Sequence, residues 1–166
     1  MSQKYKIPFI ISVFILIVTI IYETPTSRHW IYSQIVELFV PKLIKDVKCD
    51  SLLLHTNHVI LDARGKEEYK LSHLPNSIWI GDDSLALKRA SFDIGKREPR
   101  YLIYCSIGYR SQLIGKQLQD SLGFNIENLK GGVFRWNQKN MPLMDSSNNT
   151  TVKVHSYSPF WGLWKE

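Results

Sequence analysis

A cysteine at the head of a short polar loop is the feature of this sequence best suited to chemistry. Cys105 directly follows the apolar run 101–104 and precedes a stretch with the periodicity of an amphipathic helix. In an open α/β sheet, ligands bind beyond the carboxyl ends of the strands, so this position predicts a cysteine that faces the active-site crevice. The candidate substrate-binding loop consists of Ser106, Ile107, Gly108, Tyr109, Arg110 and Ser111.

The composition of this loop favours a reactive thiolate at Cys105. Backbone N–H groups in a tight, glycine-containing loop form an anion-binding concavity, and the helix that follows adds the positive end of its dipole. Arg110 brings a permanent positive charge back towards the sulfur. We therefore predict that Cys105 is a nucleophile, that the amides of 107–111 stabilise its charged adduct, and that Arg110 orients an anionic substrate. The alternative is an inert, buried cysteine that ends a strand.

The elements that position this loop follow from the alternation of short apolar runs with helical stretches. Such alternation predicts an α/β fold, an open and mostly parallel sheet with helices on both faces. The expected strands are 58–62, 77–80, 101–104 and 125–129, and the expected helices are 66–71, 83–91, 111–122 and 133–139. Gly123 should cap the helix 111–122, whose expected apolar face consists of Leu113, Ile114, Leu118 and Leu122.

An uncharged apolar run near the amino terminus predicts a membrane anchor over residues 1–27. Residues 7–22 would form about 24 Å of helix, somewhat short of the ~30 Å hydrocarbon core of a bilayer. Either the helix spans the membrane because the bilayer accommodates this hydrophobic mismatch, or the run is the apolar region of a signal sequence. Residues 23–27 approximate a cleavage site poorly, which favours the uncleaved anchor. Lys4 and Lys6 precede the run, so we expect a single-pass membrane protein with an extracytoplasmic domain, periplasmic or on the outer face.

The segments that flank the predicted domain have their own patterns. Residues 28–46 are expected to form an amphipathic helical linker that packs on the domain, with the alternative that it lies along the membrane. Residues 145–166 are expected to be a linker, rich in Ser, Asn and Thr up to Thr151, followed by an aromatic segment that covers an apolar patch. The apolar face expected for the helical linker consists of Ile31, Ile35, Leu38 and Phe39.

Charge and cysteine content exclude two other classes of protein. The net charge is +6 and the pI is about 9.3, but acidic residues are interspersed with the basic ones, so no nucleic-acid partner is expected. Cys49 and Cys105 are too few for a disulfide framework, and no cysteine and histidine cluster has metal-ligand spacing. We expect no metal and no cofactor.

Several short motifs share one order along residues 47–144. They are Leu61-Asp62-Ala63-Arg64 with Glu67, Glu68 and Tyr69, then Ser72-His73-Leu74-Pro75-Asn76-Ser77, the loop Cys105 to Arg110, Gly131-Gly132 with Trp136, and Met141-Pro142. In this order the region resembles the rhodanese-like domain family, in which a cysteine heading a six-residue loop accepts sulfane sulfur as a persulfide and passes it to a nucleophile. The resemblance implies a single-domain sulfurtransferase, similar to thiosulfate sulfurtransferases, that works through a Cys105 persulfide.

The resemblance also implies a small-molecule sulfur donor and a thiophilic acceptor. The donor would be thiosulfate or another persulfide or thiosulfonate, although Ser106 and Ile107 stand where some thiosulfate-using members carry basic residues. Asp62 and Arg64 are expected to support the site through an ion pair or through bonds to loop ends. His73 is expected to be structural and not a base.

Two alternatives to a catalytic sulfurtransferase remain open. The domain could be a membrane-attached binding module or persulfide carrier without significant turnover. It could also be a related cysteine phosphatase or arsenate reductase, but those enzymes use a Cys-x5-Arg loop, whereas this chain has Cys-x4-Arg. The shorter loop leaves too little room for a tetrahedral oxyanion.

Overall fold

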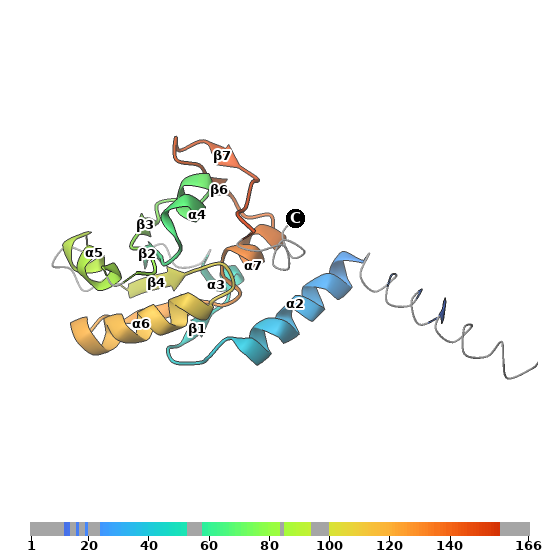
Figure 1. Ribbon diagram of the computed structural model, residues 1–166, viewed down its shortest axis with the longest axis horizontal. Helices are drawn as coiled ribbons and strands as arrows, with labels where there is room; N and C mark the ends of the chain where they lie inside the picture. Colours follow the sequence, from blue (N-terminus) through green and yellow to red (C-terminus); the bar gives the residue numbers. More distant parts are fainter. Residues whose placement is uncertain are drawn as a thin grey trace, which may run out of the picture.

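A parallel sheet lies at the centre of the domain (Figure 1). The structure is a computed structural model and describes residues 24–52, 58–83, 85–93 and 100–156, with isolated positions 12, 13, 16 and 19. Neighbouring strands pair in parallel in the order β1-β5-β4-β2-β3, so their carboxyl ends meet at one edge. The strands are β1 (Asp46–Val47), β2 (His58–Asp62), β3 (Ile78–Trp79), β4 (Arg100–Tyr104) and β5 (Ile126–Leu129). The predicted parallel α/β fold is confirmed.

Helices cover both faces of this sheet because its central strand is apolar on both sides. Leu102 and Tyr104 face one apolar cluster, and Tyr101 and Ile103 face the other, as the two-residue period of a strand requires. The helices after the first strand are α3 (Cys49–Leu52), α4 (Lys66–Leu71), α5 (Ala86–Asp93), α6 (Tyr109–Leu122) and α7 (Gly132–Gln138).

Helix α6 begins two residues earlier than expected and ends where predicted. Gly123 caps it with φ of 68°, and its N–H bonds the Gln119 carbonyl. Half of the predicted apolar face is correct, because Ile114 is buried but Leu113 is 40% exposed. Gln112 is buried beside Ile114, since its side-chain oxygen accepts hydrogen bonds from the Leu43 and Ile44 N–H groups. The other predicted positions of that face divide in the same way, Leu118 being buried and Leu122 exposed.

Helix α2 (Pro25–Phe39) packs on the domain, as predicted, at the side where β1 and α7 lie (Figure 1). The face that it buries is not the predicted one, because Leu38 and Phe39 are 78% and 62% exposed. Ile31 and Ile35 lie at the edge of the contact. The orientation of the helix is set by Tyr32, whose buried hydroxyl needs a hydrogen-bond partner. The apolar stripe that contains Tyr32 is therefore buried in place of the predicted one. That stripe consists of Tyr32, Val36 and, just after the helix, Val40.

The segment expected to be a linker is a β-hairpin turn. β6 (Leu143–Met144) pairs antiparallel with β7 (Thr150–Thr151), and Asp145 closes the turn by accepting hydrogen bonds from two backbone N–H groups downstream. Asn148 takes a φ of 60°, which asparagine tolerates well. The linker prediction is therefore wrong here, since the same Ser, Asn and Asp residues serve turns as well as linkers. The aromatic segment after residue 156 lies outside the described residues.

Among the residues that the structure describes, no helix is long and apolar enough to cross a membrane. The apolar run 7–22 lies outside the described residues apart from the four isolated positions. The predicted anchor is therefore still a prediction.

Candidate active site

Cys105 lies at the carboxyl edge of the sheet, directly after β4 and one strand away from the ends of β2 and β5. Its Sγ accepts a hydrogen bond of 3.2 Å from the Gly108 N–H, and its side chain is 1% exposed. Gly108 has φ of 105°, which residues with a side chain rarely adopt, so the turn that aims this N–H at the sulfur needs glycine. A backbone donor of this kind stabilises a thiolate, which is what the sequence predicts for the loop.

The turn that begins α7 stabilises the backbone of Cys105 through hydrogen bonds. The first turn of α7 donates from Val133 N–H to the Cys105 carbonyl at 2.9 Å and from Phe134 N–H to the Ser106 carbonyl at 3.2 Å. Gly132 lies so close that a Cβ there would stand 2.3 Å from the Cys105 carbonyl oxygen. Gly132 belongs to the Gly131-Gly132 motif, and a residue without a side chain is needed here for this close approach.

Arg110 faces carboxylates and not an open crevice. Its two terminal nitrogens bond the two oxygens of Glu68 at 2.8 and 2.9 Å, and one of them also bonds Asp82 at 2.8 Å. The other donates to the Ser106 hydroxyl at 2.9 Å. Burial opposes the charge, but Glu68, Cys105 and Asp82 together raise the pKa of Arg110 above its ordinary value. Arg110 thus stabilises the loop through hydrogen bonds, and two carboxylates balance its charge.

Glu68 is the site residue that sequence reasoning missed. It is buried, and besides Arg110 it accepts hydrogen bonds from the Ser106 hydroxyl at 2.9 Å and the Gly65 N–H at 3.0 Å. Burial tends to raise the pKa of this carboxyl, but the bonds from Arg110 outweigh it and the pKa is lowered. Glu68 therefore stays ionised and ties α4 to the cysteine loop. Its position in a short motif gave the only signal, because its partner lies 42 residues away.

The predicted ion pair between Asp62 and Arg64 is confirmed. Their closest atoms are 2.7 Å apart, and both side chains are fully buried. Arg64 also donates to the Ser72 carbonyl at 2.6 Å, while the Tyr104 hydroxyl donates to Asp62 and accepts from the Leu74 N–H at 3.1 Å. Burial raises the pKa of Tyr104 well above its ordinary value, which keeps this donor protonated. The network joins the ends of β2 and β4 to the loop 72–77.

His73 is placed away from this chemistry. Its Nδ1 lies 3.0 Å from the Tyr69 carbonyl oxygen, its ring stacks on Tyr69 at 4.0 Å, and its backbone pairs with Met144. These contacts are structural, in keeping with the expectation for this residue.

Helix α2 covers the cysteine loop, which the sequence did not predict. The Tyr32 hydroxyl donates to the Gly131 carbonyl at 2.6 Å, and Val40 lies 3.6 Å from where a Cβ on Gly108 would stand. Burial raises the pKa of Tyr32 well above its ordinary value, the nearby Arg135 lowers it and Cys105 raises it further. Tyr32 is therefore a neutral side chain that packs over the cysteine loop.

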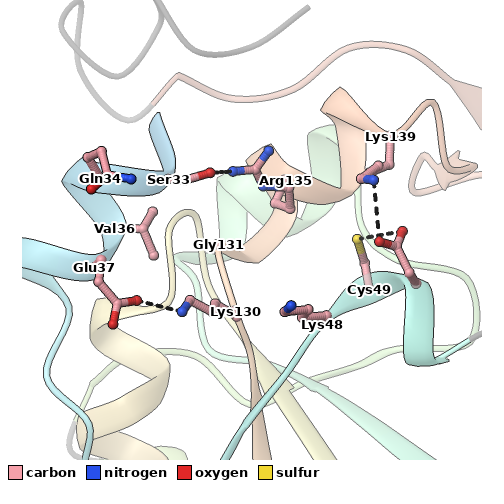
Figure 2. A pocket seen from close by; sticks show the side chains of 11 residues that line it. Ser33, Gln34, Val36, Glu37, Lys48, Cys49, Lys130, Gly131, Arg135 and Lys139 are labelled. Carbon is pink, nitrogen blue, oxygen red and sulfur yellow. Dashed lines mark hydrogen bonds and ion pairs between the residues drawn. The ribbon is translucent and has the colours of Figure 1, made fainter. Parts of the chain in front are cut away.

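A pocket of about 460 Å³ opens between α2, the end of β1, the turn after β5 and α7 (Figure 2). Cys49 lines it and is buried, and burial followed by the charge of Asp50 raises the pKa of its thiol. The Cys49 Sγ lies 3.7 Å from a carboxylate oxygen of Asp50, which pairs with Lys139 at 3.3 Å.

The fold and the loop together define an α/β protein with a buried cysteine at the carboxyl edge of a parallel sheet, whose sulfur accepts a hydrogen bond from the Gly108 N–H. Residues 48–139 match the Rhodanese-like domain family. The chain belongs to this family.

This chain is 35% identical over 88 residues to "Adenylyltransferase and sulfurtransferase UBA4" of Meyerozyma guilliermondii, a match that covers 49% of this chain and 20% of that protein. The chain therefore spans only a fifth of that relative.

Among solved structures, the rhodanese-like domain protein of Staphylococcus aureus is 25% identical with a TM-score of 0.50, covering 67% of this chain and all of that one. The thiosulfate sulfurtransferase of Pseudomonas aeruginosa is 22% identical with a TM-score of 0.52, covering 76% of this chain and 24% of that one. The similarity to this second structure concerns the fold alone.

Proposed function

We propose that this protein is a sulfurtransferase that carries sulfane sulfur on Cys105. The observation that supports the proposal most is the Cys105 Sγ held by the Gly108 N–H in a six-residue loop, in a chain of this family. The thiolate attacks the outer sulfur of a donor, a bond forms between the two sulfurs, and the rest of the donor leaves as an anion. A nucleophilic acceptor then attacks the outer sulfur of the persulfide, and Cys105 leaves as a thiolate.

The charges around the loop favour an organic persulfide or thiosulfonate over thiosulfate as donor. Ser106 and Ile107 carry no charge, and the charge of Arg110 is balanced by Glu68 and Asp82. We accordingly assign Arg110 to the shape of the loop instead of to donor binding. The name of the Meyerozyma guilliermondii relative includes sulfurtransferase, which supports the activity proposed for this chain.

Intact-mass measurement of the full-length protein after separate incubation with thiosulfate, mercaptopyruvate and glutathione persulfide tests the proposal. We expect at least one donor to add a single sulfur atom, which cyanide or dithiothreitol then removes. An aryl phosphate assayed in parallel should not be hydrolysed, because the short loop leaves too little space for a phosphate in line with Cys105. Phosphatase turnover of about 1 per second or more, without sulfur loading, would replace the sulfurtransferase assignment.

A persulfide carrier with negligible turnover is the second candidate, and one observation favours it. Cys105 is 1% exposed beneath the loop and α2, which restricts the approach of substrates. Comparing the rate of single loading with the steady-state rate separates the two candidates, since a carrier loads once and turns over only when its partner is present.

We also propose that residues 7–22 anchor the protein as a single-pass membrane protein with the domain outside the cytoplasm. The support is the uncharged apolar run preceded by Lys4 and Lys6. The full-length protein should sediment with membranes, resist salt and carbonate extraction, and keep its amino terminus. A mature chain that begins near Ser27 would instead identify a cleaved secretion signal.

A further inference from the structure

The two sides of the Cys105 loop differ in charge. On the side of α4, Arg110 faces the carboxylates of Glu68 and Asp82, which balance its charge. On the side of α2, the pocket of about 460 Å³ has more cations than carboxylates. Its cations are Lys48, Lys130, Arg135 and Lys139, and its carboxylates are Glu37 and Asp50. An anionic ligand is therefore attracted to the α2 side.

The cations of the pocket are not equally available. Lys130 pairs with Glu37 at 2.5 Å, and Lys139 pairs with Asp50 at 3.3 Å. Arg135 donates to Ser33 and to the His29 carbonyl of α2, so it helps to hold that helix. Lys48 is exposed and has no hydrogen-bonding or ion-pair partner within the described part of the chain. Figure 2 places Lys48 on the same side of the pocket as Lys130.

The turn that contains Gly131 and Gly132 both lines the pocket and contacts the backbone of Cys105. Gly131 lines the pocket and accepts the Tyr32 hydroxyl, and the next residue, Gly132, lies against the Cys105 carbonyl. Because Glu37 belongs to α2, an anion that takes its place on Lys130 also removes a bond that holds α2 over the loop.

We propose that this pocket binds the carboxylate-bearing part of an organic anion that donates sulfur to Cys105, and that Lys48 determines this specificity. The inference rests on the proposed function. A pocket of this volume lies in the range of ~300–1,000 Å³ that holds small organic ligands, more than a single inorganic anion fills. In the reaction, the Cys105 thiolate and R–S–SH give the Cys105 persulfide, which keeps the proton, and the thiolate R–S⁻ leaves.

The test compares donors with and without carboxylates on the full-length protein in non-ionic detergent. Glutathione persulfide carries two carboxylates, and ethyl persulfide carries none. We expect Lys48→Glu to raise the half-saturating concentration of glutathione persulfide about fivefold or more, and to leave that of ethyl persulfide unchanged. S-Methylglutathione, which cannot donate sulfur, should compete with glutathione persulfide in the wild type and much less in this variant.

Lys88→Glu is the matched control, because Lys88 is exposed on α5, which packs with α6 away from the pocket. It makes the same change of charge and should leave both donors unaffected. Equal weakening of both donors by Lys48→Glu, or equal weakening of glutathione persulfide by the two substitutions, would overturn the inference while leaving the sulfurtransferase assignment standing. Failure of both donors to load the wild-type protein would overturn the proposed function itself.

Discussion

Cys105→Ser should abolish sulfur loading from every donor. A serine hydroxyl is not ionised at neutral pH and forms no persulfide, so the loss should reach the detection limit, at least about 10³-fold. The loop should keep its shape, because the hydroxyl can accept the Gly108 N–H as Sγ does. Intact mass after incubation with a donor measures the effect, and circular dichroism shows whether the variant folds.

Cys49→Ser is the control for this experiment. Cys49 is also buried, but burial and then the charge of Asp50 raise the pKa of its thiol. The variant should load sulfur at the wild-type rate, and iodoacetamide should modify Cys105 before Cys49. Loading that survives in Cys105→Ser and disappears in Cys49→Ser would show that the nucleophile has been assigned to the wrong cysteine.

The elements around Cys105 could be predicted because their signals are local. Four consecutive apolar residues, 101–104, suit a central parallel strand that is buried on both faces. Gly123 ends α6 because glycine readily adopts the left-handed conformation. The cysteine loop could be predicted because it lies between β4 and α6.

The contacts that complete the site could not be predicted, because their partners are distant in sequence. Arg110 has the right type and position for an anion-binding residue, yet the fold brings Glu68 and Asp82 to it. Helix α2 illustrates the same limit, since two adjacent apolar stripes compete for burial. The stripe with Tyr32 is buried because the fold supplies the Gly131 carbonyl to its hydroxyl, a pairing across 99 positions. Periodicity reveals an amphipathic helix but not which of two such stripes has a partner.

Gly132→Ala should damage both stability and sulfur loading, because there is no space for a methyl group behind Cys105. The new Cβ would stand 2.3 Å from the Cys105 carbonyl oxygen and 2.6 Å from that of Ser106, and both are backbone atoms with no rotamer to change. The φ of 54° adds strain for any residue with a side chain. We expect a loss of about 2–4 kcal/mol in the free energy of unfolding.

Relief of this clash must move the α7 turn away from the loop and weaken the bond from the Val133 N–H to the Cys105 carbonyl. Because a shift of about 1 Å in a reacting group can cost about 10²-fold in rate, sulfur loading should slow by that order. Gly123→Ala separates the clash from backbone strain, since Gly123 has φ of 68° but nothing within 4 Å of its new methyl group. It should cost about 1 kcal/mol and leave loading unchanged. Thermal denaturation and the loading rate of both variants decide the matter, and equal effects of the two substitutions would mean that the Gly132 turn does not hold the cysteine loop in place.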